Sequence, residues 1–382
     1  MVAFFFFCVK IFFSFDFTER CVIIFYRKIW RIGVKKISYF DERDIKTREK
    51  IEEVKNKLPS FCSEYAISIL SAGCSSLTAY NYLIDLTVFF EYLADCFNKQ
   101  PSEIEIKDLE TLKAKDISSF LDYQRLGRGR ELNGKMVESK SGIKAIARKL
   151  SSIKSLFRYL FNNEMIASNV TTRIPTPKIS MEDHSIKRLN KEETKVFLDA
   201  PNNKTAFGQQ HNHYLENTAE RDKAIISLFL ATGIRVSELV GLDVLDVNLA
   251  SLTIDVRRKG GKLERLYFAE DLAKVLEIWV AKRESLNLPK NETAFFISLQ
   301  RKRMSVSSVE KMIGKYAEVL LGKKLSPHKL RATYGTELYK ATGDIYQVAT
   351  ALGHSSVDTT KRHYADTDEQ KKREIAGKVR IG

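Results

Sequence analysis

Apolar side chains recur at helical spacing through most of the chain from residue 41 onward. The spacing predicts a helix over 41–58 that Pro59 closes, a helix over 77–94 capped by Ser76, and a helix over 116–126 capped by Asp116. The segment that follows, 127–135, contains three glycines among arginines and a lysine. We therefore expect a flexible basic loop there.

The strongest amphipathic pattern lies at 141–163. Its apolar positions alternate by three and four, so they form one stripe: Ile143, Ile146, Leu150, Ile153, Phe157 and Leu160. At about 100° per residue, four cations share an adjacent arc: Lys144, Arg148, Lys154 and Arg158. One buried face and one cationic face suit a groove of DNA, with a solvated charged face as the alternative interpretation.

A second folded region is expected after a linker. Residues 172–180 contain two prolines and no periodicity, and Asn190 is a suitable cap for a helix that follows Leu189. The polar stretch 202–218 indicates a surface loop. It holds His211 and His213, but no further ligand lies near them, which argues against a metal site.

The second region combines helices with one hairpin. An apolar helix is predicted over 221–233, and alternating strands over 252–256 and 263–268 flank the basic tip Arg257–Lys262. Helices are predicted over 270–285, 305–321, 327–341 and 344–352, with a short one ending near residue 364. The fold class is therefore mainly α with a small antiparallel β-hairpin or sheet.

Residues 1–40 differ from the rest. The first 26 are rich in phenylalanine, but Lys10, Asp16, Glu19 and Arg20 interrupt them, which argues against a membrane span. No basic segment precedes the phenylalanines and no cleavage motif follows, which argues against a signal peptide. An interfacial anchor, a hydrophobic flap and an upstream extension outside the functional fold all remain open, and we favour the extension.

The net charge of the chain is the strongest indication of its binding partner. The chain of 382 residues has 63 Lys and Arg against 48 Asp and Glu, a formal net charge of +15. This excess favours a polyanionic partner, of which nucleic acid is the commonest, although anionic membranes also bind basic proteins. Five scattered cysteines are typical of a protein in a reducing cytoplasm, and none of them has the C-x-x-C spacing of a zinc motif. We therefore expect a cytoplasmic protein.

Three segments of the second region carry candidate chemistry. In A-T-G-I-R-V-S-E, a glycine ends one helix and Arg235 begins the next, where an anion is favoured; Glu238 lies three residues on and can hold Arg235. In S-P-H-K-L-R, His328 and Arg331 share a helical face. In L-G-H-S-S-V-D-T-T-K-R-H-Y, His354 follows a helix-ending glycine and Tyr364 lies ten residues later.

Together and in this order, these segments resemble the tyrosine recombinase family of the phage-integrase type. The resemblance implies that Arg235 is the first catalytic arginine, that His328 and Arg331 form the HxxR pair, and that His354 and Tyr364 are the second histidine and the nucleophile. In the hairpin R-R-K-G-G-K, Lys259 matches the family's lysine, with Lys262 as the alternative. Many members place the tyrosine nine residues after the histidine rather than ten. The rivals Tyr334, Tyr339 and Tyr346 do not follow the L-G-H-S turn.

The sequence pattern sets the boundaries of a domain plan that agrees with the resemblance: an apolar and basic N-terminal extension at 1–40 whose status stays open, a helical core-binding (SAM-like) domain at 41–171, a linker at 172–188, and a mixed α/β catalytic domain with a C-terminal tail at 189–382. The resemblance implies a site-specific recombinase that cuts and rejoins DNA through a 3′-phosphotyrosyl intermediate, without metal, other cofactor or ATP, as a homo-tetramer on two duplexes. Two alternatives remain: a type IB topoisomerase-like nicking-closing enzyme, and a catalytically silent DNA-binding accessory protein.

Overall fold

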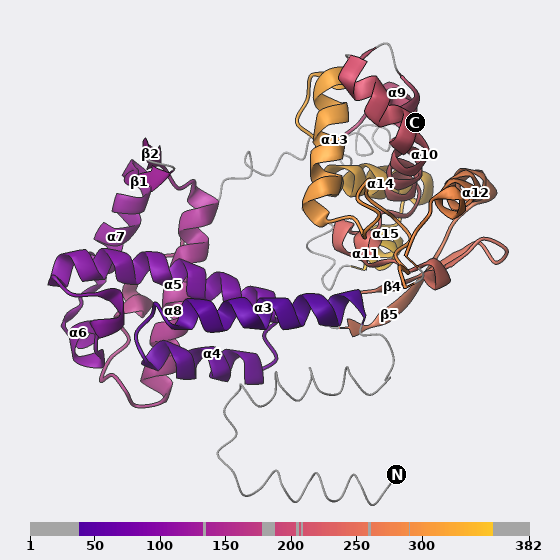
Figure 1. Cartoon of the computed structure of the whole chain (residues 1–382). Coiled ribbons are helices and arrows are strands. Elements are labelled where there is room, and N and C mark those ends of the chain that lie inside the picture. Colours follow the sequence, from indigo (N-terminus) through magenta and orange to yellow (C-terminus); the bar gives the residue numbers. More distant parts are fainter. Residues whose placement is uncertain are drawn as a thin grey trace, which may run out of the picture. The chain divides into compact units, whose positions relative to one another are not determined.

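A computed structural model describes residues 38–132, 135–177, 188–203, 206–207, 209–258, 261–289 and 291–353 (Figure 1). The chain divides near residue 180 into two compact units. Most described residues are helical, and the strands form one two-stranded and one three-stranded antiparallel sheet. The predicted fold class, mainly α with a small antiparallel sheet, is confirmed.

The first unit is built on helices that pack around α5. Its elements are α3 (Tyr39–Lys55), α4 (Phe61–Ser71), α5 (Ser76–Phe97), η2 (Pro101–Glu103), α6 (Ile106–Thr111), α7 (Ala114–Leu126), β1 (Arg128–Leu132), β2 (Lys135–Ser139), α8 (Ile143–Asn162) and η3 (Val170–Arg173). Helices α3 and α8 both pack against α5. Five of the six predicted stripe positions of α8 are buried, from Ile146 to Leu160, whereas Ile143 is exposed at the first turn.

Two predicted helix starts in this unit need correction. Helix α5 is capped by Ser75, whose hydroxyl accepts the Thr78 amide at 3.2 Å, one residue before the predicted cap. Helix α7 begins at Ala114, two residues before the predicted start. Asp116 lies inside its first turn, where its carboxylate accepts the Lys113 amide at 2.8 Å. Side-chain acceptors one residue apart cannot be ranked by sequence, because the choice depends on backbone geometry.

The predicted glycine-containing loop is a β-hairpin. Strands β1 and β2 pair in antiparallel register from Arg128 opposite Ser139 to Leu132 opposite Lys135. The first part of the predicted linker is also ordered: Ile174 is buried in the core of the first unit, and its carbonyl oxygen accepts the Lys154 ammonium at 2.7 Å. The chain therefore stays in the first unit at least as far as Ile174, two residues beyond the predicted start of the linker at residue 172.

The second unit is organised around one long helix, α10 (Gln209–Thr232), which packs against α12 and α14. The other elements are α9 (Lys191–Leu198), η5 (Ala200–Asn202), α11 (Val236–Gly241), η7 (Val244–Asp246), β3 (Val247–Asn248), β4 (Thr253–Arg257), β5 (Leu263–Tyr267), α12 (Glu270–Ser285), α13 (Val306–Leu321), α14 (Pro327–Thr342) and α15 (Ile345–Leu352). Ala224, Ile225 and Phe229 of α10 are fully buried.

The start of α10 corrects the predicted surface loop at 202–218. The helix extends back to Gln209, and Leu215 in this part is fully buried. A polar segment can be helical with so few apolar side chains because tertiary packing supplies most of the stability of a helix. The side chains of His211 and His213 lie outside the described part of the chain. The predicted cap of α9 is confirmed: the Asn190 side chain accepts the Glu193 amide at 2.8 Å.

The hairpin between β4 and β5 is present as predicted. The strands pair in antiparallel register from Thr253 opposite Tyr267 to Arg257 opposite Leu263, and β3 adds a short third strand that was not predicted. Among the described residues, no helix is both long and apolar enough to cross a membrane. The three hypotheses for the apolar N-terminal segment concern residues that lie almost entirely before the described part, which begins at Ser38.

Candidate active site

The turn between α10 and α11 requires a glycine. Gly233 has a φ of +61°, and a Cβ there would lie 2.4 Å from the Tyr334 ring. The Thr232 hydroxyl donates to the Leu228 carbonyl at 2.7 Å and accepts the Ile234 amide at 3.3 Å, which fixes the direction of the chain beyond the helix. This tight turn places Arg235 at the N-cap of α11.

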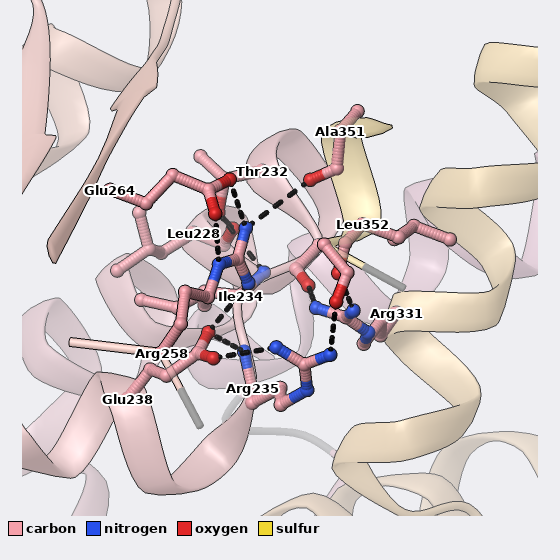
Figure 2. A network of polar contacts seen from close by, with 12 residues as sticks. Leu228, Thr232, Ile234, Arg235, Glu238, Arg258, Glu264, Arg331, Ala351 and Leu352 are labelled. Carbon is pink, nitrogen blue, oxygen red and sulfur yellow. Dashed lines mark hydrogen bonds and ion pairs between the residues drawn. The ribbon is translucent and has the colours of Figure 1, made fainter. Parts of the chain in front are cut away.

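Arg235 is held from two sides (Figure 2). One terminal nitrogen donates to Glu238 Oε1 at 2.8 Å, and the other donates to the Gly353 carbonyl at 2.9 Å. Glu238 is almost completely buried and also accepts the backbone amide of Arg235 at 3.0 Å. The predicted contact between Arg235 and Glu238 is therefore confirmed. The Arg235 side chain remains 33% exposed, so it is partly accessible to an anion.

Arg331 joins the same turn from α14. It is 4% exposed and donates from its two terminal nitrogens to the carbonyl oxygens of Gly233 and Leu352. These bonds connect the end of α10, the start of α14 and the end of α15 (Figure 2). Because neither partner is a carboxylate, the positive charge of Arg331 is not neutralised by these contacts.

His328 lies one turn before Arg331, in the first turn of α14, where Pro327 is the first helical residue. Desolvation, followed by the charges of Arg331 and Arg235, lowers the pKa of the imidazole below its ordinary value. The imidazole is therefore neutral near pH 7 and able to accept a proton. The structure brings together three of the six predicted residues: Arg235, His328 and Arg331.

The other three predicted residues, Lys259, His354 and Tyr364, lie outside the described residues. Two of them directly follow described members of the cluster, since Arg258 precedes Lys259 and Gly353 precedes His354. The alternative lysine, Lys262, is exposed, and its carbonyl oxygen accepts the Arg258 amide at 2.8 Å.

Sequence reasoning missed two members of this polar network, Arg258 and Glu264. The Arg258 guanidinium bonds to Glu238, Glu264 and the Ala351 carbonyl. Nothing in the local pattern distinguishes Arg258 from the other basic residues of the hairpin sequence, because its burial depends on segments far away in the chain.

The four cations predicted on α8 have different surroundings. Arg148 contacts the buried Asp85 carboxylate at 2.9 Å, and Lys154 donates to Ile174 as described above. Burial raises the pKa of Asp85, and the positive charges of Arg148 and Lys149 oppose this rise. Lys144 and Arg158 are exposed on the surface of the first unit.

Comparisons with known proteins match both units. The phage integrase family matches residues 187–371, and the phage integrase N-terminal SAM-like domain matches residues 64–164. Tyrosine recombinase XerS of Streptococcus equi subsp. zooepidemicus (strain H70) is 35% identical over 353 residues, covering 84% of this chain and 96% of the relative. XerS of Streptococcus pneumoniae serotype 19F (strain G54) is 34% identical over 352 residues, covering 85% and 96%.

Solved structures show the same fold. XerH site-specific recombinase bound to a palindromic difH substrate in a post-cleavage complex aligns with a TM-score of 0.61 and 20% identity, covering 87% of this chain and 89% of that one. A lambda integrase dimer bound to a COC′ core site aligns with a TM-score of 0.54 and 17% identity, covering 78% and 95%.

A SAM-like helical domain followed by a catalytic domain with this arginine-rich site defines the class of phage-integrase-type enzymes. The chain belongs to the phage integrase family. It is a tyrosine recombinase, and its function is site-specific recombination, as the resemblance implied.

Proposed function

We propose that this recombinase cuts and rejoins duplex DNA through a 3′-phosphotyrosyl intermediate, with Tyr364 as the nucleophile. The observation that carries the proposal is the convergence of Arg235 and Arg331 on one turn, with His328 beside them. Both guanidiniums are fixed by backbone carbonyls before any substrate binds. Such preorganised donors are what a developing phosphorane charge requires.

The two arginines act on the non-bridging oxygens of the scissile phosphate. A guanidinium presents two parallel donors to a phosphate and stays charged at every physiological pH. Because these cations compensate the extra negative charge of the transition state, the reaction as proposed needs no metal ion. His354 is proposed to donate a further hydrogen bond to the same phosphate.

Attack and departure each require one proton transfer. The Tyr364 oxygen forms a bond to phosphorus as its proton passes to a base, and neutral His328 is the base that this site offers. The bond from phosphorus to the 5′-oxygen breaks, and Lys259 is proposed to give that oxygen a proton. The phosphodiester is exchanged for a phosphotyrosyl ester, so religation needs no ATP.

Structural features of the rival tyrosines support Tyr364. Tyr339 is buried in a small apolar cluster with Val348 and Leu352. Burial raises the pKa of Tyr334, against the opposing charges of Arg331 and Arg258, and its ring lies against Gly233. Tyr346 is exposed on α15 but lies before the turn at Gly353.

We propose double-stranded DNA as the partner of both units. XerH and lambda integrase, which share the fold, were solved in complexes with difH and COC′ core-site DNA, respectively. In the first unit, Lys144 and Arg158 are exposed on α8, and we propose that they contact the phosphate backbone together with Arg148 and Lys154 of the same helix. Assembly as a homo-tetramer on two duplexes, in the cytoplasm where that DNA lies, completes the proposal.

Covalent trapping tests the proposal. The protein is incubated in EDTA with DNA from both sides of its own gene, and SDS-resistant adducts are measured for wild type and Tyr364→Phe. We expect an adduct that survives EDTA and disappears in the variant. Salt-sensitive binding without any adduct would favour the accessory protein. Relaxation of supercoiled DNA without sequence preference would favour a topoisomerase-like enzyme.

A further inference from the structure

We propose that Arg258 is a positioning residue: it holds the hairpin turn that carries Lys259 in a fixed position relative to Arg235. The inference rests on the proposed function, because it assigns Arg258 a part in delivering the proton to the leaving 5′-oxygen. The Arg258 side chain is only 6% exposed, so we infer that it acts through the residues that it contacts.

The Arg258 side chain connects three separate segments (Figure 2). It donates to Glu238 Oε2 of α11 at 2.9 Å, to the two carboxylate oxygens of Glu264 of β5 at 2.9 and 3.1 Å, and to the Ala351 carbonyl of α15 at 3.4 Å. Burial disfavours the cation, but the two carboxylates raise the pKa of Arg258, so it stays charged. Glu238 is shared, since its other oxygen holds Arg235.

The Arg258 backbone closes the hairpin tip. Its amide donates to the Lys262 carbonyl at 2.8 Å, and its carbonyl accepts the Gly261 amide at 3.1 Å. The next residue in the chain is Lys259. One residue therefore anchors the base of this turn by its peptide groups and ties it to the site by its side chain.

Arg258 also packs on the segment that leads to His354. Gly353 has a φ of +57°, and a Cβ there would lie 3.0 Å from Arg258 Nε and 3.1 Å from its Cζ. The Gly353 carbonyl in turn accepts a bond from Arg235. The guanidinium of Arg258 thus fills the space that a larger residue at 353 would need.

The geometry requires arginine rather than another cation. Three groups of acceptors lie around one planar guanidinium, which offers five donors in a fixed fork. A lysine ammonium at this position is a single point charge and cannot reach both carboxylates in the same geometry. Arg258→Lys keeps the charge of the network and removes the link between Glu238 and Glu264, which makes it the sharpest substitution.

The test uses a nicked duplex that carries the site recovered by covalent trapping, prepared with either oxygen or sulfur at the 5′-bridging position. A thiolate leaves without a proton, so the sulfur substrate does not need the lysine. Single-turnover cleavage is measured for wild type, Arg258→Lys and Glu264→Gln, with Lys259→Ala as the reference for a lost proton donor. Arg265→Lys is the matched control, since Arg265 pairs with Asp255 on the same hairpin but is 57% exposed.

We expect Arg258→Lys to slow cleavage of the oxygen substrate by about 100-fold, the loss that a small misplacement of a catalytic group produces. Cleavage of the sulfur substrate should stay within about threefold of wild type, as for the reference variant. Glu264→Gln, which leaves the bond between Arg258 and Glu238 in place, should give a smaller loss with the same sulfur rescue. Arg265→Lys should match wild type on both substrates.

Equal losses on both substrates would overturn the inference, because they would show a general structural or phosphate-binding defect. Full activity of Arg258→Lys on the oxygen substrate would overturn it as well. Failure of the proposed function is a different result: wild type itself would then form no adduct with either substrate, and the inference would fall with it.

Discussion

The turn that fixes Arg235 and Arg331 should be sensitive to a single added methyl group at Gly233. Gly233→Ala places a Cβ 2.4 Å from Tyr334 Cδ1 and 3.0 Å from Leu352 Cδ2, at a φ of +61°. Gly322→Ala is the matched control: its φ is +58°, and nothing lies within 4 Å of the added Cβ. Both variants therefore carry the same backbone strain, and only one carries a clash.

The magnitudes follow from these two contributions. Left-handed backbone costs alanine about 1–2 kcal/mol at either position. Overpacking adds about 1–3 kcal/mol at Gly233 alone, because the contact is with a ring held in place by its helix and not with the end of a flexible side chain. Gly233→Ala should therefore lower the free energy of unfolding by about 1–3 kcal/mol more than Gly322→Ala.

Urea unfolding measures the difference. Trp279 is buried in the second unit, where its indole donates to the Phe295 carbonyl at 3.1 Å. The chain has two tryptophans, so a Trp30→Phe background makes Trp279 the sole reporter. The midpoint should fall further for Gly233→Ala at unchanged slope. Equal midpoints for the two variants would refute the packing argument for this turn.

Three further predictions concern charged groups. The acid limb of the pH profile of kcat/KM for DNA cleavage should be centred below about pH 6.5, because the pKa of His328 in the free protein lies below its ordinary value, and His328→Gln should lack this limb. A limb centred above about pH 7 would contradict the assignment. Arg148→Ala should lower the free energy of unfolding of the first unit by about 1–3 kcal/mol, because it removes the closest partner of the buried Asp85. Arg158→Ala should leave the free energy of unfolding unchanged and reduce the salt slope of DNA binding by about one. Urea titrations and binding isotherms that gave the opposite assignment of the two effects would refute this prediction. Glu238→Gln should lower the free energy of unfolding by about 1.5–3 kcal/mol in the Trp279 assay, since two guanidiniums share this carboxylate, and an unchanged midpoint would show that the shared contact contributes nothing.

The features that sequence predicted well are those set by local patterns. Helix α12 spans Glu270–Ser285, the predicted bounds, and the apolar stripe of α8 is buried as expected apart from Ile143. The contact between Arg235 and Glu238 was predictable because it joins residues three apart on one helical turn. Order and spacing of the candidate motifs likewise identified the family.

The features that sequence missed depend on tertiary contacts. The polar start of α10 and the hairpin at 128–139 have weak local signals, and packing or strand pairing decides their structure. Arg258 and Ala351 are far apart in the chain, and no periodicity relates them. Burial of a cation follows from where its carboxylate partners lie, and only the folded structure shows that.

The most direct test of the account is to identify the residue that becomes bonded to DNA. The EDTA-resistant adduct is digested with protease and nuclease, and mass spectrometry locates the tyrosine that carries the nucleotide remnant. The account predicts the remnant on Tyr364, linked through the 3′-phosphate. A remnant on Tyr334, Tyr339 or Tyr346, or a 5′-linked remnant, would contradict it.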